Sequence, residues 1–161
     1  MPRALIALLI LIGCALPARA EPLVADISES VVKITTGFTG TKVLLFGAIE
    51  GKGKVVVIVE GPRHSITVRR KERIAGIWIN RDTLQFVDAP SFYQVLASDT
   101  LDEWLPLRTR EDHQIGVEYL DLKPKAKVGP AEKAEFRDAL IRNMQRIGRY
   151  GALEENVKLL G

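Results

Sequence analysis

The two histidines are the side chains of this chain best suited to metal binding or acid–base catalysis. His64 stands in a Gly-Pro-Arg-His stretch, and His113 follows two acidic residues, Glu111 and Asp112. A metal site would need the two rings to converge with a carboxylate, and nothing in their spacing requires this. We therefore interpret both histidines as solvated loop residues, and we predict no metal ligands and no cofactor.

Nucleophilic chemistry has equally little support in the sequence. No serine stands in a Gly-x-Ser-x-Gly elbow, and the single cysteine, Cys14, lies near the N-terminus. The Gly-Lys-Gly-Lys stretch at 51–54 lacks the other residues of a phosphate-binding loop, so a turn explains it better. No catalytic residue is predicted. One alternative stays open: a pocket between sheet and helix could serve a periplasmic small-ligand binder or hydrolase-type enzyme, with His64 or His113 as acid or base.

Basic residues are concentrated in one segment of the chain, at Arg63, Arg69, Arg70, Lys71 and Arg73. In a strand, successive side chains point to opposite faces, so Arg69, Lys71 and Arg73 share one face while Arg70 belongs to the other. A solvated face, or an edge strand protected by charge against aggregation, is one interpretation. The other is a contact with anionic lipid headgroups or an acidic partner. The residues predicted for such a contact are Arg63, Arg69, Lys71 and Arg73.

The first 20 residues have the pattern of a secretory signal. A basic start at Arg3 precedes an apolar run from Ala4 to Ile12, which is too short to span a bilayer. Small residues at Ala18 and Ala20 then form a signal-peptidase site, so we expect cleavage to leave Glu21 as the mature N-terminus. A lipobox ending at Cys14 is the alternative, and acylation there would tether the protein to a membrane.

Removal of this segment changes the interpretation of the charge. The full chain has a formal net charge of +3, and loss of two arginines brings the remainder close to neutrality. A near-neutral domain offers no overall reason to expect nucleic acid as a partner. The remainder also contains no cysteine, so disulfides and thiolate sites are excluded there and packing must supply the stability.

The first half of the remaining chain is typical of an antiparallel β-protein, with short apolar runs separated by turn residues. Strands are predicted at 31–36 and 42–49, joined as a hairpin through a loop with two glycines, and at 55–59. The last of these is apolar on both faces, which predicts a central position. Further strands are predicted at 65–73, 74–80 and 83–87. The predicted fold class is mainly β, an antiparallel sandwich-like domain with one amphipathic C-terminal helix.

The second half is less regular. Thr100 and Glu103 match a capping box for a short helix, the stretch 107–122 fits either helix or strand, and 123–129 is a polar linker. Pro130 opens a helix whose apolar stripe is formed by Phe136, Leu140, Met144 and Ile147. A further strand is expected to begin at 156–161.

Trp78 and Trp104 are interpreted as core or rim residues. The domain division is thus 1–20 signal peptide, 21–129 β-rich domain, and 130–161 helix with the start of a strand.

Five short blocks, in order along the chain, resemble a known family. They are LVADIS at 23–28, ITTGFTG at 34–40, VRRK at 68–71, AGIWIN at 75–80 and PSFY at 90–93. Together they are similar to the alphaproteobacterial putative transmembrane protein family. This resemblance implies a signal peptide, a periplasmic β-rich domain, a further β segment and one C-terminal membrane helix. Because the sequence stops at Gly161, before any such helix, we expect either a truncated version or a soluble variant that has lost its anchor. The ending inside an apparent strand favours truncation, since a half-made strand leaves backbone groups unpaired.

Export, β architecture and the resemblance lead to one functional expectation. We expect a periplasmic domain, membrane-anchored in its family, that acts as a non-catalytic interaction module or as an accessory to a membrane transporter. The expected partner is a membrane protein or an anionic membrane surface.

Overall fold

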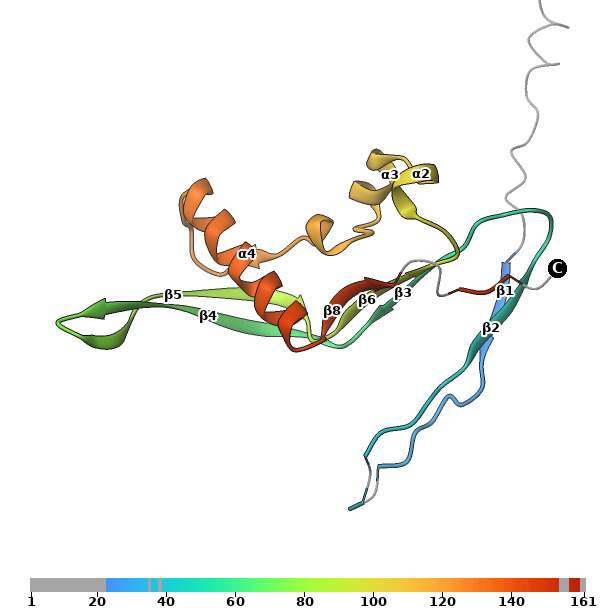
Figure 1. Ribbon diagram of the computed structural model, residues 1–161, viewed down its shortest axis with the longest axis horizontal. Helices are drawn as coiled ribbons and strands as arrows, with labels where there is room; N and C mark the ends of the chain where they lie inside the picture. Colours follow the sequence, from blue (N-terminus) through green and yellow to red (C-terminus); the bar gives the residue numbers. More distant parts are fainter. Residues whose placement is uncertain (1–22, 35, 38, 154–156, 160–161) are drawn as a thin grey trace, which may run out of the picture. The chain divides into compact units, whose positions relative to one another are not determined.

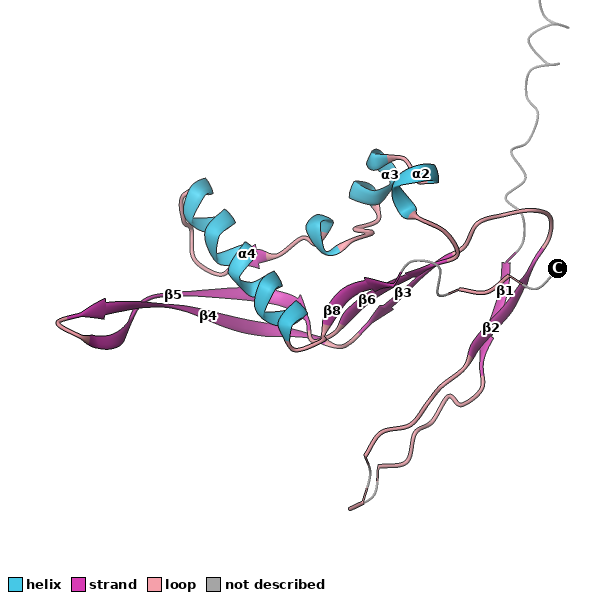
Figure 2. Cartoon of the chain, in the orientation of Figure 1, coloured by secondary structure: helices cyan, strands magenta, loops and turns pink. Residues whose placement is uncertain are grey.

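The computed structural model describes residues 23–34, 36–37, 39–153 and 157–159. The predicted signal peptide, its cleavage site and Cys14 lie outside these residues. The chain divides into two compact units, with the boundary between Gly53 and Lys54. Figure 1 traces the elements of each unit, and Figure 2 separates their helices from their strands.

The first unit is an antiparallel pair of strands, β1 (Leu23–Ile27) and β2 (Leu45–Ile49), in which Leu23 lies opposite Ile49. The predicted pairing of 31–36 with 42–49 is wrong, because 31–34 form no strand and β2 pairs with β1. Ser28 explains where the ladder ends. Its N–H donates to the Leu44 carbonyl at 2.8 Å, and its hydroxyl accepts from the Leu44 N–H at 3.0 Å. The side chain thus takes the place of the next backbone partner.

The second unit is built on a long antiparallel ribbon. One side is β3 (Val56–Glu60) followed by β4 (Arg63–Ile74), and the other is β5 (Ile77–Pro90) followed by β6 (Tyr93–Ala97). The two sides of the ribbon are interrupted opposite one another, at residues 61–62 and 91–92. A Cβ at Gly61 would lie 2.5 Å from the Ser91 hydroxyl oxygen, so only glycine permits this close crossing.

The β4–β5 hairpin differs from the prediction of separate strands at 74–80 and 83–87. Ala75 and Gly76 form its two-residue turn, with φ values of 49° and 85°, so that Ile74 ends β4 and Ile77 begins β5. Positive φ at both central residues is the geometry that matches strand twist in two-residue hairpins. A bulge lies opposite the Arg70/Lys71 step, where β5 accommodates Arg81 as an extra residue.

Strand order places β6, and not β3, at the centre of its sheet. The order is β3-β6-β8, where β8 (Tyr150–Leu153) runs parallel to β6. The prediction of a central 55–59 strand is therefore wrong: β3 is an edge strand in the described chain, and Ile58 and Val59 are 38% and 44% exposed. Strand β8 also begins before the strand expected at 156–161. Of that stretch, 157–159 are described and form no strand.

The C-terminal helix α4 (Pro130–Arg146) is confirmed, and it packs against β4 and β8. Its buried residues are Phe136, Leu140, Ile141 and Met144. Ile147 is not part of the stripe, because the helix ends before it and its side chain is 53% exposed. Gly148 at φ 69° terminates the helix: the N–H of the next residue, Arg149, donates to the Met144 carbonyl at 2.8 Å, closing a Schellman-type end.

Shorter elements connect β6 to α4. They are α2 (Leu101–Trp104), α3 (Leu107–Asp112), the 3-10 turn η1 (Val117–Tyr119) and β7 (Lys123–Pro124), which pairs with β5. Thr100 precedes α2 as predicted, but its side chain makes no capping hydrogen bond. Instead the Thr100 carbonyl accepts from the Glu103 N–H at 3.2 Å.

Helices cover one side of the ribbon in the second unit, as Figure 2 shows. The core lies between these layers and combines strand residues such as Phe86 and Tyr93 with Leu101, Leu120 and the buried side of α4. The predicted fold class is confirmed: strands predominate, the main sheets are antiparallel, and one long amphipathic helix stands near the C-terminus. The sequence did not indicate that the layer facing the ribbon is helical.

Candidate functional site

Three cations form the surface that we call the β4 basic face: Arg69, Lys71 and Arg73. Strand alternation places them on one side of β4, opposite Thr83, Asn80 and Trp78 of β5. All three are exposed, and no carboxylate of the described residues lies within ion-pair distance of them. Arg73 Nε donates only to the Gly76 carbonyl, at 3.2 Å. The face therefore presents three positive charges that the described protein does not neutralise.

Arg70 points to the other side of the strand, where its charge is neutralised. Its guanidinium donates to Asp82 of β5, with Nε 2.9 Å from Oδ2, and to Glu135 of α4, with Nη1 2.8 Å from Oε2. It also lies over the Phe136 ring, 5.6 Å from the centroid. The hydrogen bonds to Asp82 and Glu135 raise the pKa of Arg70. This residue holds α4 against the ribbon and is not available to a partner.

Arg63, the fourth predicted contact residue, lies apart from the β4 basic face. Its Nε donates to Glu60 at 2.5 Å, and its Nη1 donates to the Asp88 carbonyl at 3.0 Å. The hydrogen bond to Glu60 is the largest cause of its raised pKa. The structure thus brings three of the four predicted residues together and gives Arg63 a pairing role.

Arg81, at the bulge, was missed in the sequence. It forms an ion pair with Glu72 of the facing strand. The two acidic residues of the outer ribbon, Glu72 and Asp82, are therefore both engaged by arginines on the side away from the β4 basic face. The sequence signal for this arrangement is the adjacent pair Arg81 and Asp82. It follows a strand that carries a partner of opposite sign for each, Glu72 for Arg81 and Arg70 for Asp82.

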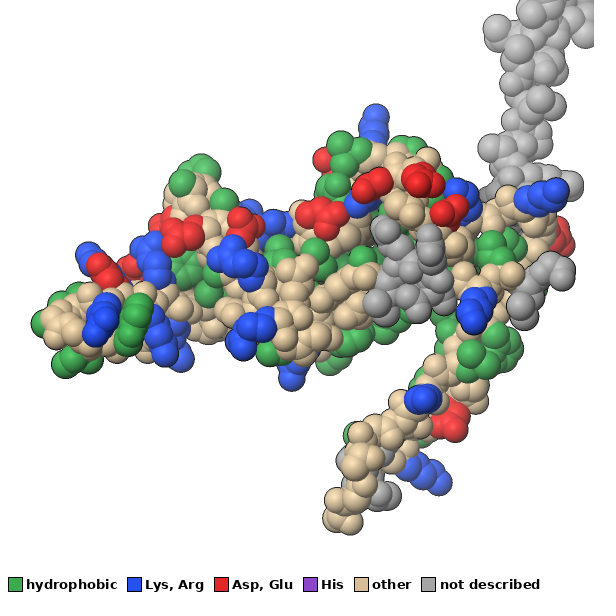
Figure 3. Space-filling model, in the orientation of Figure 1, with side chains coloured by type: hydrophobic (Ala, Val, Ile, Leu, Met, Phe, Trp, Pro, Cys, Tyr) green, Lys and Arg blue, Asp and Glu red, His purple; other side chains and the backbone are tan. Residues whose placement is uncertain are grey.

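The outer end of the hairpin is apolar and exposed. Ile74, Ile77, Trp78 and Ile79 are 47%, 68%, 65% and 42% exposed. The interpretation of Trp78 as a core or rim residue is wrong, because the turn at Ala75 and Gly76 places it beyond the helical layer. Trp104, in contrast, does pack against the core. Figure 3 shows hydrophobic and cationic side chains next to one another at this end of the ribbon.

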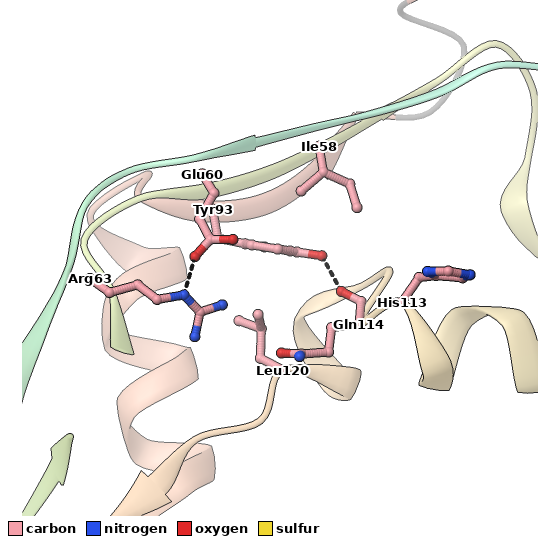
Figure 4. Close-up of a pocket in the computed structure, with 7 residues that line it drawn as sticks. All are labelled: Ile58, Glu60, Arg63, Tyr93, His113, Gln114 and Leu120. Atoms are coloured by element: carbon pink, nitrogen blue, oxygen red, sulfur yellow. Dashed lines mark hydrogen bonds and ion pairs between the residues drawn. The ribbon is translucent and has the colours of Figure 1, made fainter. Parts of the chain in front are cut away.

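A small cavity of about 90 Å³ lies beside Tyr93 and is lined in part by His113 (Figure 4). Ligand pockets for small molecules usually measure roughly 300–1,000 Å³. Four of the polar residues that line this cavity bind one another: Glu60 pairs with Arg63, and the Tyr93 hydroxyl donates to the Gln114 carbonyl at 2.5 Å. His64 does not line it. This residue is solvent-exposed as predicted, but it lies in β4 and not in a loop, with its ring Nδ1 3.4 Å from the Pro62 carbonyl.

The fold and surface define a β-rich domain whose most distinctive features are a cationic strand face and an exposed apolar hairpin end. Residues 22–161 match the model of a family described as "Putative transmembrane protein (Alph_Pro_TM)", and the chain belongs to this family. The family membership expected from the five sequence blocks is confirmed. Searches of curated proteins and of solved structures found no match. In the part of the chain that the structure describes, no helix has both the length and the hydropathy to cross a membrane.

Proposed function

We propose that this protein is an exported, non-catalytic binding module of a membrane-associated protein, and that it contacts an anionic lipid surface through the β4 basic face. The observation that carries this proposal is the contrast between neighbouring cations. Arg63, Arg70 and Arg81 each have a carboxylate partner, whereas Arg69, Lys71 and Arg73 have none among the described residues. Family membership and the signal-like N-terminus support the membrane setting and the export.

The energetics favour lipid as the partner of an unpaired cationic face. Each Lys or Arg near an anionic membrane surface contributes roughly 1 kcal/mol, and the attraction extends over about a Debye length of roughly 8–10 Å. Cations that already have a carboxylate partner would lose that ion pair on binding, whereas these three have no ion pair among the described residues to lose. A role as accessory to a membrane transporter remains a prediction.

Vesicle co-sedimentation tests the proposal. Wild-type protein and variants, purified with the same N-terminus, are compared on vesicles of phosphatidylglycerol mixed with phosphatidylcholine and on phosphatidylcholine alone. We expect salt-sensitive binding to the anionic vesicles only. Reversal of two charges, Arg69→Glu with Lys71→Glu, should weaken the partition coefficient by at least about 30-fold, since two lost charges correspond to about 2 kcal/mol.

The matched control is Lys125→Glu with Lys127→Glu, which makes the same change of charge at two exposed loop residues of the same unit. This control should bind far more tightly than the β4 variant, and circular dichroism should show both variants folded. An equal loss of vesicle binding in the two variants would show that binding depends on net charge alone and not on the β4 basic face. Unchanged binding of the β4 variant would remove the proposed contact.

A further inference from the structure

The tip of the β4–β5 hairpin combines apolar side chains on both of its faces. Ile74, Ile77 and Ile79 share the side that carries Glu72, and Trp78 lies on the β4 basic face opposite Arg73. The tip extends past α4, so that no helix covers it (Figure 1). A contiguous exposed group of large apolar residues usually marks a site of interaction with a partner or a membrane.

The turn itself is unusually apolar. Two-residue turns of this geometry favour Asn or Asp followed by Gly, because their side chains tolerate positive φ. Here the first position is Ala75, at φ 49°, a conformation that alanine adopts only with strain. The hairpin end thus lacks a polar side chain at a position where one would favour both the fold and the solubility.

Charges follow immediately behind this apolar tip. Arg73, Lys71 and Arg69 succeed one another at every second residue, a rise of roughly 6–7 Å for each step. Lys and Arg side chains can lay their stems along apolar surface while their charges reach headgroups, and tryptophan is enriched at membrane–water interfaces. The carboxylates of this stretch, Glu72 and Asp82, are paired with arginines, which removes them as a source of repulsion.

We infer that the hairpin tip, with Trp78 and the three isoleucines, inserts into the headgroup and upper acyl region of an anionic bilayer while the β4 basic face binds the headgroups. This inference rests on the proposed function and adds the mode of contact. Insertion stops at the interface because the ribbon has two strands, and the outward backbone N–H and C=O groups of both would be unsatisfied in the hydrocarbon core.

Fluorescence of Trp78 tests the insertion directly. The chain contains two tryptophans, so Trp104→Phe leaves Trp78 as the single reporter. This change is conservative because the buried Trp104 Nε1 has no hydrogen-bond partner. On anionic vesicles we expect a blue shift of Trp78 emission, and stronger quenching by lipids brominated near the headgroup than by lipids brominated near the chain end. If Trp104→Phe fails to fold, the difference between the wild type and Trp78→Phe gives the same signal.

A tip variant measures the apolar contribution. Ile77→Ser should weaken partition into anionic vesicles by about five- to tenfold, because the variant buries less apolar side-chain surface in the bilayer than the wild type does. Leu107→Ser, at a residue that is 58% exposed but lies on α3, is the matched control and should leave the partition unchanged.

The outcomes separate the two proposals. Salt-sensitive vesicle binding with unshifted, unquenched Trp78 would overturn insertion and leave the electrostatic contact intact. Absence of binding to any vesicle would overturn both. A blue shift that appears without lipid and grows with protein concentration would show that a second copy covers the tip, and would also overturn insertion.

Discussion

At the residue scale, the two buried tyrosines show how the core accommodates polar groups. The Tyr93 and Tyr150 rings meet edge to face, with centroids 6.2 Å apart. The Tyr93 hydroxyl donates to the Gln114 carbonyl and accepts from the Gly116 N–H at 3.1 Å, while the Tyr150 hydroxyl donates to the Pro90 carbonyl at 2.6 Å. Both hydroxyls are therefore satisfied: Tyr93 anchors the loop at 114–116 to β6, and Tyr150 joins β8 to the end of β5.

These tyrosines predict a loss of stability at alkaline pH. Burial raises the pKa of Tyr150 to about 12, above the value of roughly 10 expected in the unfolded chain. The contribution of Tyr150 to the free energy of unfolding is therefore complete below about pH 10. It is lost as the pH rises from there toward the folded-state pKa, because in this pH range only the unfolded state releases the hydroxyl proton. Urea denaturation at about pH 9, 10 and 11 should show the free energy of unfolding falling.

Tyr150→Phe provides the control for this prediction. The variant should lose about 1 kcal/mol near neutral pH, where the hydrogen bond to the Pro90 carbonyl is missing. Its slope above about pH 10 should be shallower than that of the wild type by up to about 1.4 kcal/mol per pH unit, with Tyr93 still contributing because burial also raises its pKa. Identical slopes would show that Tyr150 does not carry the effect.

At the element scale, α4 stabilises the ribbon through a buried side that differs by one residue from the predicted stripe. Ile141 is buried, whereas Ile147 lies just beyond the last helical residue. Helical periodicity alone allowed both, since 3.6-residue spacing defines a broad stripe and not its limit. Because the helix is terminated at Gly148, Ile147 lies outside the helix and its side chain is exposed.

This difference predicts opposite results for two truncations. Leu140→Ala should destabilise the protein by about 2–5 kcal/mol, because it leaves a cavity under the helix, while Ile147→Ala should change stability by no more than about 0.5 kcal/mol. Thermal or urea unfolding of both variants measures the effect. A large loss for Ile147→Ala would mean that its side chain packs in the core.

At the scale of the whole molecule, the chain belongs to a family described as "Putative transmembrane protein", and its N-terminal segment has the features of an export signal. An exported location would expose the β4 basic face to the outer surface of a bacterial inner membrane.

Mass spectrometry of the protein from a bacterial host tests the export. The expected mature chain begins at Glu21 and is recovered from the periplasmic fraction. A diacylated or triacylated N-terminus at Cys14 would support the lipobox alternative and a lipid anchor. A cytosolic product that retains Met1 would contradict export, and with it the proposed setting of the module.

The sequence by itself determined the features that depend on local pattern. Apolar runs between turn residues predicted a mainly β protein, Pro130 and the recurring apolar positions predicted α4, and the five short blocks identified the family. It did not reveal β6, whose alternation of Tyr93, Val95 and Ala97 is too short to stand out but forms the centre of a sheet.

Only the tertiary structure decided which cations are free and which apolar residues are exposed. Arg70 is neutralised by Asp82 and Glu135, residues 12 and 65 positions away, while its neighbours Arg69 and Lys71 face the other side of the strand. Trp78 became exposed because the turn divides a run that resembled one strand. Charge pairing and burial depend on contacts between distant residues, and local pattern contains no information about which of these form.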